Sequence, residues 1–392
     1  MAGFVVPVLA ALSVLTSEVC YDRLGCFTND APWAGTLQRP IGCLPWSPEK
    51  INTRFLLYTK DNVKTYQEVS AVNPGTISDS NFRPERKSRF VIHGFTDSGE
   101  KSWLTDLCQA VLQVEDVNCF CVDWSGGSQT LYTQAANNIR VVGAEVAYFT
   151  TTLLEIFNYS LSNIYIIGHS LGAHTAGEAG KRRPGIGRIT ALNDFVACNH
   201  MRSYHYYIES VLSPDGFIGF PSSSYHDFLA GAGFPCSSGG CARMGHDADK
   251  YRGVTAETQT FYLNTGDQEN FSRWRYKVSV RTAGSSVVLG SFAVSVQGSN
   301  GKSPEYTIYR GLIRPDTTYS HFVDSEVDVG FISMATFVWR SDLPLIFQRM
   351  LGASVITVQF GADGTNTSLC DSGTVPDRTP QNLRPCAEPA PL

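Results

Sequence analysis

Residues 162–172 read SNIYIIGHSLG, and this stretch decides the fold. A short apolar run leads into the motif GHSLG at residues 168–172, and small residues follow it. A strand, a tight turn and a helix in this order predict a nucleophile elbow, the strained turn that raises a serine hydroxyl above a parallel sheet. Glycine suits both ends of the motif, because a side chain there would collide with the neighbouring strand or helix. We therefore predict that Ser170 is a catalytic nucleophile; the alternative is an ordinary strand-to-helix corner.

The composition and the N-terminus predict a secreted protein. A chain of 392 residues is expected to form about two domains, and a net charge of -5 argues against a nucleic-acid partner. The apolar run at residues 4–15 is too short to span a bilayer and is placed like a signal peptide, which we assign to residues 1–17. No later apolar stretch of the sequence is long enough for a membrane helix, so we expect a soluble extracellular protein.

The eleven cysteines also indicate an oxidising compartment, and their odd number leaves at least one unpaired. Three glycosylation sequons, at Asn158, Asn270 and Asn366, fit the same route. Spacing suggests pairs but does not fix them. The suggested pairs are Cys20 with Cys26, Cys108 with Cys119 or Cys121, Cys236 with Cys241, and Cys370 with Cys386. Cys43, Cys198 and either Cys119 or Cys121 are left over.

Alternating strand-like and helical stretches predict a mainly parallel α/β sheet in the first part of the chain. Apolar residues spaced by three and four predict a helix over residues 132–157 that packs on this sheet. The expected strands are 53–58, 89–93, 118–124 and 164–168.

From about residue 261 the apolar residues recur with a period of two, which predicts a second, all-β domain built as a sandwich. We place the two domains at residues 18–254 and 255–392. The expected strands of the second domain are 276–280, 292–296, 306–309, 331–339 and 354–360.

The stretch RFVIHGF at residues 89–95 ends a predicted strand at a His-Gly turn. A backbone N–H just after such a turn projects over the sheet toward the serine. Together with the N–H after the nucleophile it would form an oxyanion hole, which binds the negative oxygen of a tetrahedral intermediate. We predict that the two donors belong to Phe95 and Leu171.

Besides the elbow, the sequence contains the motifs EVCY (18–21), LPWSPE (44–49), RFLLYT (54–59), VDW (122–124), RVVGA (140–144), CNHMRSY (198–204), MGH (244–246), FYLNTG (261–266) and WRY (274–276). Through these motifs the chain resembles the pancreatic lipase family, and most closely its lipase-related proteins. The resemblance extends over nearly the whole chain after the signal peptide.

The resemblance implies an α/β-hydrolase domain, mainly of parallel sheet, followed by a PLAT-type β-sandwich that docks colipase. It also implies hydrolysis of acylglycerol esters at a lipid–water interface, with triacylglycerols, galactolipids or phospholipids as substrates. Ser170 matches the family nucleophile and His200 matches the family general base.

The sequence departs from this family at residues 193–194. Asn193 occupies the position of the catalytic acid, and Asp194 opens the motif that ends at His200, which the family places several dozen residues further on. The intervening acid loop, calcium-binding carboxylates, a sheet strand and the lid are absent, so we expect no calcium and no other cofactor. The family partner of Cys198 would lie in the same missing segment. A metal site at GHDAD (245–249) is not expected, because the usual zinc spacings are absent.

The junction leaves the catalytic acid open. The seven residue-to-residue steps from 193 to 200 reach up to about 23 Å, while neighbouring strands are about 4.8 Å apart, so His200 is able to reach Ser170. Asp194 would serve as the acid only through a shift of one residue, which normally reverses the direction of a side chain. The alternatives to a working lipase are a catalytically impaired member that only binds colipase or lipid surfaces, and a splice product that fails to fold.

Overall fold

The computed structural model describes residues 17–37, 39, 42–193, 197–236, 240–268, 270–342 and 349–387. The first sixteen residues of the predicted signal peptide lie outside this description. The chain forms two compact units, Met1–Ile208 and Glu209–Leu392. Within the described part, no helix is both long and apolar enough to cross a membrane.

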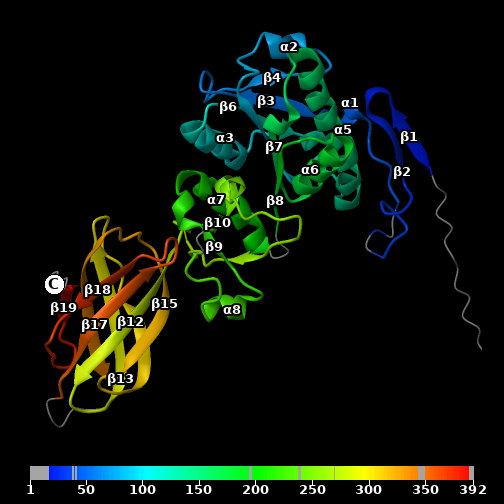
Figure 1. Cartoon of the computed structure of the whole chain (residues 1–392). Helices are drawn as coiled ribbons and strands as arrows, with labels where there is room; N and C mark the ends of the chain where they lie inside the picture. Colours follow the sequence, from blue (N-terminus) through cyan, green and yellow to red (C-terminus); the bar gives the residue numbers. More distant parts are fainter. Residues whose placement is uncertain are drawn as a thin grey trace, which may run out of the picture. The chain divides into compact units, whose positions relative to one another are not determined.

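The first unit is built on a mixed six-stranded sheet in the order β4-β3-β6-β5-β7-β8 (Figure 1). Strand β5 runs parallel to β6 and β7, β7 runs parallel to β8, and β3 is antiparallel to both β4 and β6. The four predicted strands correspond to β3, β5, β6 and β7, with small differences at their ends. The strands are β3 (Arg54–Tyr58), β4 (Gln67–Val69), β5 (Lys87–Ile92), β6 (Val117–Asp123), β7 (Ile164–His169) and β8 (Arg188–Leu192).

Helices cover both faces of this sheet, with α3 on one side and α5 and α6 on the other (Figure 1). The predicted helix at 132–157 is α5. It ends because Asn158 adopts a left-handed conformation with φ 51°, and its Phe149 stacks on Phe55 of β3 at 4.3 Å between ring centroids. The helices are α1 (Pro48–Ile51), α2 (Gly75–Ser78), α3 (Ser102–Val114), α4 (Ser125–Ser128), α5 (Tyr132–Phe157), α6 (Leu171–Arg182) and α7 (Ala197–Leu212).

A hairpin of β1 (Glu18–Tyr21) and β2 (Gly25–Thr28) precedes the sheet, and Cys20 lies opposite Cys26 in its ladder. These two residues form a disulfide, as predicted. The pairs Cys236–Cys241 and Cys370–Cys386 are also confirmed. The side chain of Cys198 lies outside the described residues.

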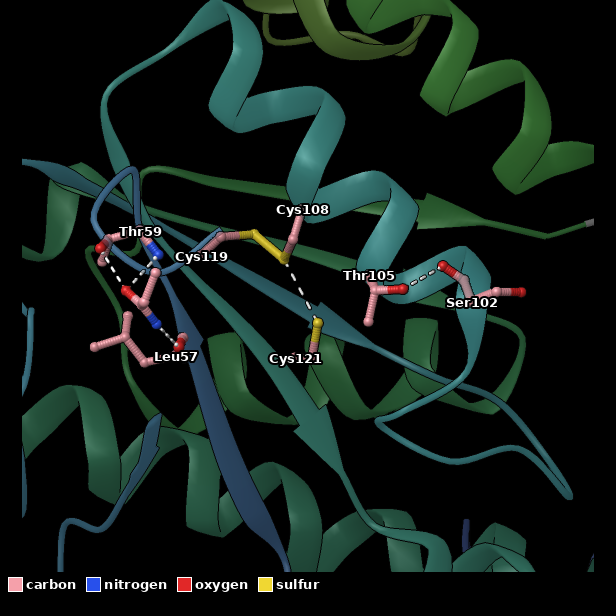
Figure 2. The surroundings of a disulfide bond; sticks show 8 residues. Leu57, Thr59, Ser102, Thr105, Cys108, Cys119 and Cys121 are labelled. Carbon is pink, nitrogen blue, oxygen red and sulfur yellow. Dashed lines mark hydrogen bonds between the residues drawn. A yellow bond between two sulfur atoms is a disulfide. The ribbon is translucent and has the colours of Figure 1, made fainter. Parts of the chain in front are cut away.

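The remaining choice of partner for Cys108 is settled in favour of Cys119. Figure 2 shows why both candidates were plausible: Cys119 and Cys121 lie two residues apart on β6, and both face Cys108 on α3. The Cys121 sulfur lies 3.5 Å from the Cys108 sulfur and stays a free thiol, as does that of Cys43. Burial raises the pKa of the Cys121 thiol well above its usual range, so this thiol is protonated and inert at neutral pH.

The second unit contains an antiparallel eight-stranded sheet in the order β14-β13-β16-β19-β18-β17-β12-β15, consistent with the predicted β-sandwich. Its strands enclose one apolar core in which Phe292, Phe337 and Trp339 are fully buried. The sequence did not predict β15, β18 and β19. The strands are β12 (Trp274–Gly284), β13 (Val288–Gly298), β14 (Tyr306–Ile313), β15 (Thr318–Ser325), β16 (Ile332–Ser341), β17 (Leu351–Phe360), β18 (Asn366–Cys370) and β19 (Gln381–Pro385).

A smaller three-stranded sheet in the order β10-β9-β11 precedes these strands in the second unit. Its strands are β9 (Ile218–Pro221), β10 (Ala242–Arg243) and β11 (Phe261–Tyr262), and the short helix α8 (Tyr225–Leu229) follows β9.

Candidate active site

The predicted strand-turn-helix order is present at Ser170, which connects the end of β7 to the start of α6. Ser170 has φ 56° and ψ -121°, a strained conformation that non-glycine residues rarely adopt. A Cβ on Gly168 would lie 2.2 Å from the carbonyl oxygen of Gly172, and a Cβ on Gly172 would lie 2.2 Å from that of Ile92. Only glycine fits at these two positions, which is what a nucleophile elbow requires.

A cavity of about 670 Å³ opens beside Ser170. Phe95, Leu171 and His200 line it, so the structure brings together the nucleophile, the base and both oxyanion donors that the sequence predicted. Their catalytic roles stay predictions. The other lining residues are Thr96, Asp97, Lys101, Tyr132, His169, His174, Asn193 and Met201.

The first predicted oxyanion donor, the N–H of Leu171, is positioned by helix α6. Leu171 is the first residue of this helix, so its N–H has no partner within the helix. The aligned peptide dipoles add partial positive charge at this end. An oxygen that becomes negative above Ser170 would therefore meet a favourable field at Leu171.

The second predicted donor, the N–H of Phe95, is oriented by His93, which is fully buried behind the turn. Its Nε2 accepts a hydrogen bond from the N–H of Trp124 at 3.0 Å, so Nδ1 carries the hydrogen and donates to the carbonyl of Gly94 at 2.9 Å. The ring also stacks on Trp124 at 5.3 Å. In a planar trans peptide the N–H of Phe95 points opposite to the Gly94 carbonyl, that is, away from His93.

The base candidate His200 lies near the start of α7. His169, which directly precedes the nucleophile, contacts it twice: His169 Nε2 lies 3.1 Å from the carbonyl oxygen of His200, and the two rings are 4.6 Å apart. Trp103 and Tyr204 also contact the ring of His169. No spacing in the sequence marks His169, because periodicity does not reveal contacts between distant elements.

The position expected for the catalytic acid holds no carboxylate. Asn193 lines the cavity, whereas Asp194 lies outside the described residues. Among the lining residues that the structure describes, Asp97 alone carries a carboxylate, and it accepts a hydrogen bond from Trp103 Nε1 at 2.7 Å. The sequence did not single out Asp97, although it stands only two residues after Phe95, the predicted oxyanion donor.

Burial governs the charge of the residues around the base. Burial lowers the pKa of His169, so its ring is neutral at pH 7. Burial and, secondarily, the charge of Asp97 raise the pKa of Tyr204. Besides these neutral groups, the described residues that line the cavity include one aspartate, Asp97, and one lysine, Lys101.

The described residues contain few potential metal ligands that lie close together. Their one group of potential ligands is Glu18, Cys20 and Cys26, in which the two cysteines are joined as a disulfide. In the stretch at 245–249, Asp247 pairs with Lys250 at 2.8 Å. The expectation of no calcium and no other cofactor stays a prediction.

Comparison with known proteins connects this geometry to one family. The profile of the family described as Lipase matches residues 17–194 and 192–271. The two matches meet at the junction between Asn193 and Asp194, where the sequence predicts that a segment is absent.

Three relatives cover nearly the whole chain. Pancreatic lipase-related protein 2 of Cavia porcellus is 46% identical over 434 residues, covering 94% of this chain and 100% of the relative. Pancreatic triacylglycerol lipase of Myocastor coypus is 45% identical over 95% of this chain and 99% of its own. The protein named inactive pancreatic lipase-related protein 1 of Mus musculus is 43% identical over 97% of this chain and 98% of its own.

The lengths of these alignments also indicate a missing segment. The first alignment spans 434 positions, whereas 94% of a 392-residue chain is about 370 residues, so roughly 65 positions face a gap.

Proposed function

The chain belongs to the lipase family and is of the pancreatic type, and from this premise we propose that it hydrolyses acylglycerol esters at Ser170. The observation that carries the proposal is the shared cavity of Ser170, His200, Phe95 and Leu171. Relatives of the pancreatic type cover almost the full chain, and one of them is named a triacylglycerol lipase, which supports triacylglycerols as the substrate class. Galactolipids or phospholipids are the alternatives.

The reaction follows the two-step chemistry of a serine nucleophile. Ser170 Oγ attacks the ester carbonyl carbon while His200 takes the hydroxyl proton, and the carbonyl oxygen becomes an oxyanion held by the N–H groups of Phe95 and Leu171. The intermediate collapses to an acyl-serine, and His200 returns the proton to the departing glycerol oxygen. Water then attacks the acyl-serine by the same sequence and releases the fatty acid.

The acid of the triad is the weakest component. Asn193 carries no charge to stabilise the imidazolium of His200, and the corresponding Asp-to-Asn change in a serine protease lowers kcat about 10⁴-fold. Asp194 is the alternative acid, but it serves only through a shift of one residue, which normally reverses the direction of a side chain. Without it, only slow hydrolysis by Ser170, His200 and the oxyanion hole remains.

The other parts of the proposal concern location and partners. Residues 1–17 would direct secretion as a signal peptide, and residues 18–254 would form the α/β-hydrolase domain. Residues 255–392 would form a PLAT-type domain that docks colipase at the lipid–water interface. No calcium or other cofactor takes part.

A second candidate function is lipid or colipase binding without turnover. It is favoured by the uncharged Asn193 at the acid position, and a relative that is itself named inactive shows similar overall identity.

The decisive experiment measures hydrolysis of a short-chain triacylglycerol by the chain secreted from cultured cells, with Ser170→Ala as the matched control and the secreted amount quantified. We expect activity that Ser170→Ala abolishes. Folded, secreted protein no more active than Ser170→Ala would overturn the proposal in favour of the binding role. Failure of both chains to be secreted would instead indicate a damaged fold.

A further inference from the structure

His169 links the nucleophile to the element that carries the base. It is the last residue of β7 and is 5% exposed, and Ser170 follows it directly. Its Nε2 lies 3.1 Å from the carbonyl oxygen of His200, which can only accept a hydrogen bond. His169 is therefore the donor, and this bond spans from the nucleophile strand to the start of α7.

The tautomer follows from the same contact. With the hydrogen on Nε2, the neutral ring leaves Nδ1 bare, and within the described part of the chain this buried atom has no hydrogen-bond partner. A buried polar atom without a hydrogen-bond partner costs free energy. The ring therefore keeps this orientation because of its other contacts, and not because both of its nitrogens are hydrogen-bonded. The single bond to the His200 carbonyl is the polar contact that orients it.

Aromatic side chains fix the ring in this position. Trp103 and Tyr204 meet His169 edge-on, at 5.4 and 5.3 Å between ring centroids, and stack on each other at 4.7 Å. Trp103 is anchored through its Nε1 to Asp97. Tyr204 lies one helical turn after His200 on α7, so the same aromatic cluster that orients His169 also anchors the helix of the base.

We propose that His169 is the positioning residue that places the base His200 against Ser170, a task otherwise left to the six-residue link at 194–199. The inference rests on the proposed function of Ser170 and His200. His169 does not touch the reacting atoms; it acts by holding the backbone from which the His200 ring projects. Misplacement of a base by about 1 Å is enough to cost a large factor in rate.

Two substitutions separate this role from simple packing. In His169→Gln the side-chain amide can still donate to the His200 carbonyl, whereas in His169→Phe the ring packing against Trp103 and Tyr204 is kept and the donor is lost. We expect His169→Phe to lower kcat tenfold or more with KM nearly unchanged, because one hydrogen bond corresponds to about a tenfold factor and the reacting geometry depends on it. We expect His169→Gln to stay within about threefold of the unsubstituted chain. Full activity in His169→Phe, or equal loss in both variants, would overturn the proposal.

Two further readouts keep this test separate from the proposed function. Single-turnover labelling of Ser170 by a fluorophosphonate, followed by intact mass, reports on the base even where the acyl-serine is not released. The ¹³C-labelled ring of His200, observed by NMR, reports its position without any reaction; we expect its signal to shift or broaden in His169→Phe and not in His169→Gln. If the unsubstituted chain neither labels nor turns over, the proposed function fails, and an unchanged His200 signal in His169→Phe would independently reject the positioning role.

Discussion

Asn193 sets the expected activity of the chain at the scale of a single residue. It lines the cavity of Ser170 and His200 but carries no charge. We predict that Asn193→Asp raises kcat on a short-chain triacylglycerol by a factor on the order of 10² or more with little change in KM, since a carboxylate there stabilises the imidazolium and selects the productive tautomer.

Asp194→Asn is the matched control for this prediction. If Asn193 leaves the triad without an acid, Asp194→Asn has little effect and Asn193→Asp restores the rate. The opposite result, a large loss in Asp194→Asn and no gain in Asn193→Asp, would show that Asp194 has taken over the role of the acid.

At the same scale, the sequence predicts some of these residues and misses others for a physical reason. Ser170, Leu171 and Phe95 are marked by local motifs, because a tight turn and a helix start leave their signature in neighbouring residues. His169, Trp103 and Tyr204 carry no such signature, because their cluster forms among residues from β7, α3 and α7, which no local spacing connects.

At the scale of elements, helices and strands with strongly periodic apolar residues were predicted well, and those with weak periodicity were missed. The apolar spacing of residues 132–157 reproduces the bounds of α5, because one face of that helix is buried against the sheet. β15 was missed because it lies at the end of its sheet order and buries few side chains, so its sequence TYSHFVDS shows little alternation.

The strand β8 gives a prediction at this scale. It ends the sheet order, so within the described residues no strand pairs with its outer side, and its Ile189 is 42% exposed. We predict that amides of β8 exchange with deuterated water much faster than those of β5, which is paired on both sides. Hydrogen-exchange mass spectrometry at several protein concentrations provides the measurement.

The dependence on concentration makes this prediction specific. Protection of β8 that grows with concentration would indicate pairing with a second copy of the chain, as open sheet edges permit. Protection equal to that of β5 in the dilute monomer would contradict the prediction and show that another part of the chain covers the edge.

At the scale of the whole molecule, the division at Ile208 and Glu209 makes two unfolding transitions the expected behaviour. The first unit contains Asp123, whose carboxylate lies 3.1 Å from Arg54. Burial alone would raise the pKa of Asp123, but hydrogen bonds from the N–H groups of Gly99 and Ser125 and from the Ser125 hydroxyl outweigh it and hold that pKa well below its usual range.

This shift predicts how stability depends on pH. A lowered pKa in the folded state means that the stabilisation by Asp123 is present above its unfolded pKa of about 4 and is lost as the pH falls toward the folded value. We predict that, in calorimetric scans, lowering the pH from 5 to 3 lowers the midpoint temperature of the first unit's transition more than that of the second unit's transition. In Asp123→Asn the same transition should be lower at pH 7 and depend less on pH; two transitions with equal acid sensitivity would contradict the assignment.

The lack of a side chain at Gly94 leaves room for the side chain of Ser170. A Cβ at residue 94 would lie 2.7 Å from the Cβ of Ser170 and 3.3 Å from its hydroxyl oxygen. The single methyl group of an alanine at residue 94 would therefore crowd the side chain of Ser170 and leave its hydroxyl group in place. A bound, uncleaved substrate complex would be trapped in this way, with Ser170 and His200 chemically intact.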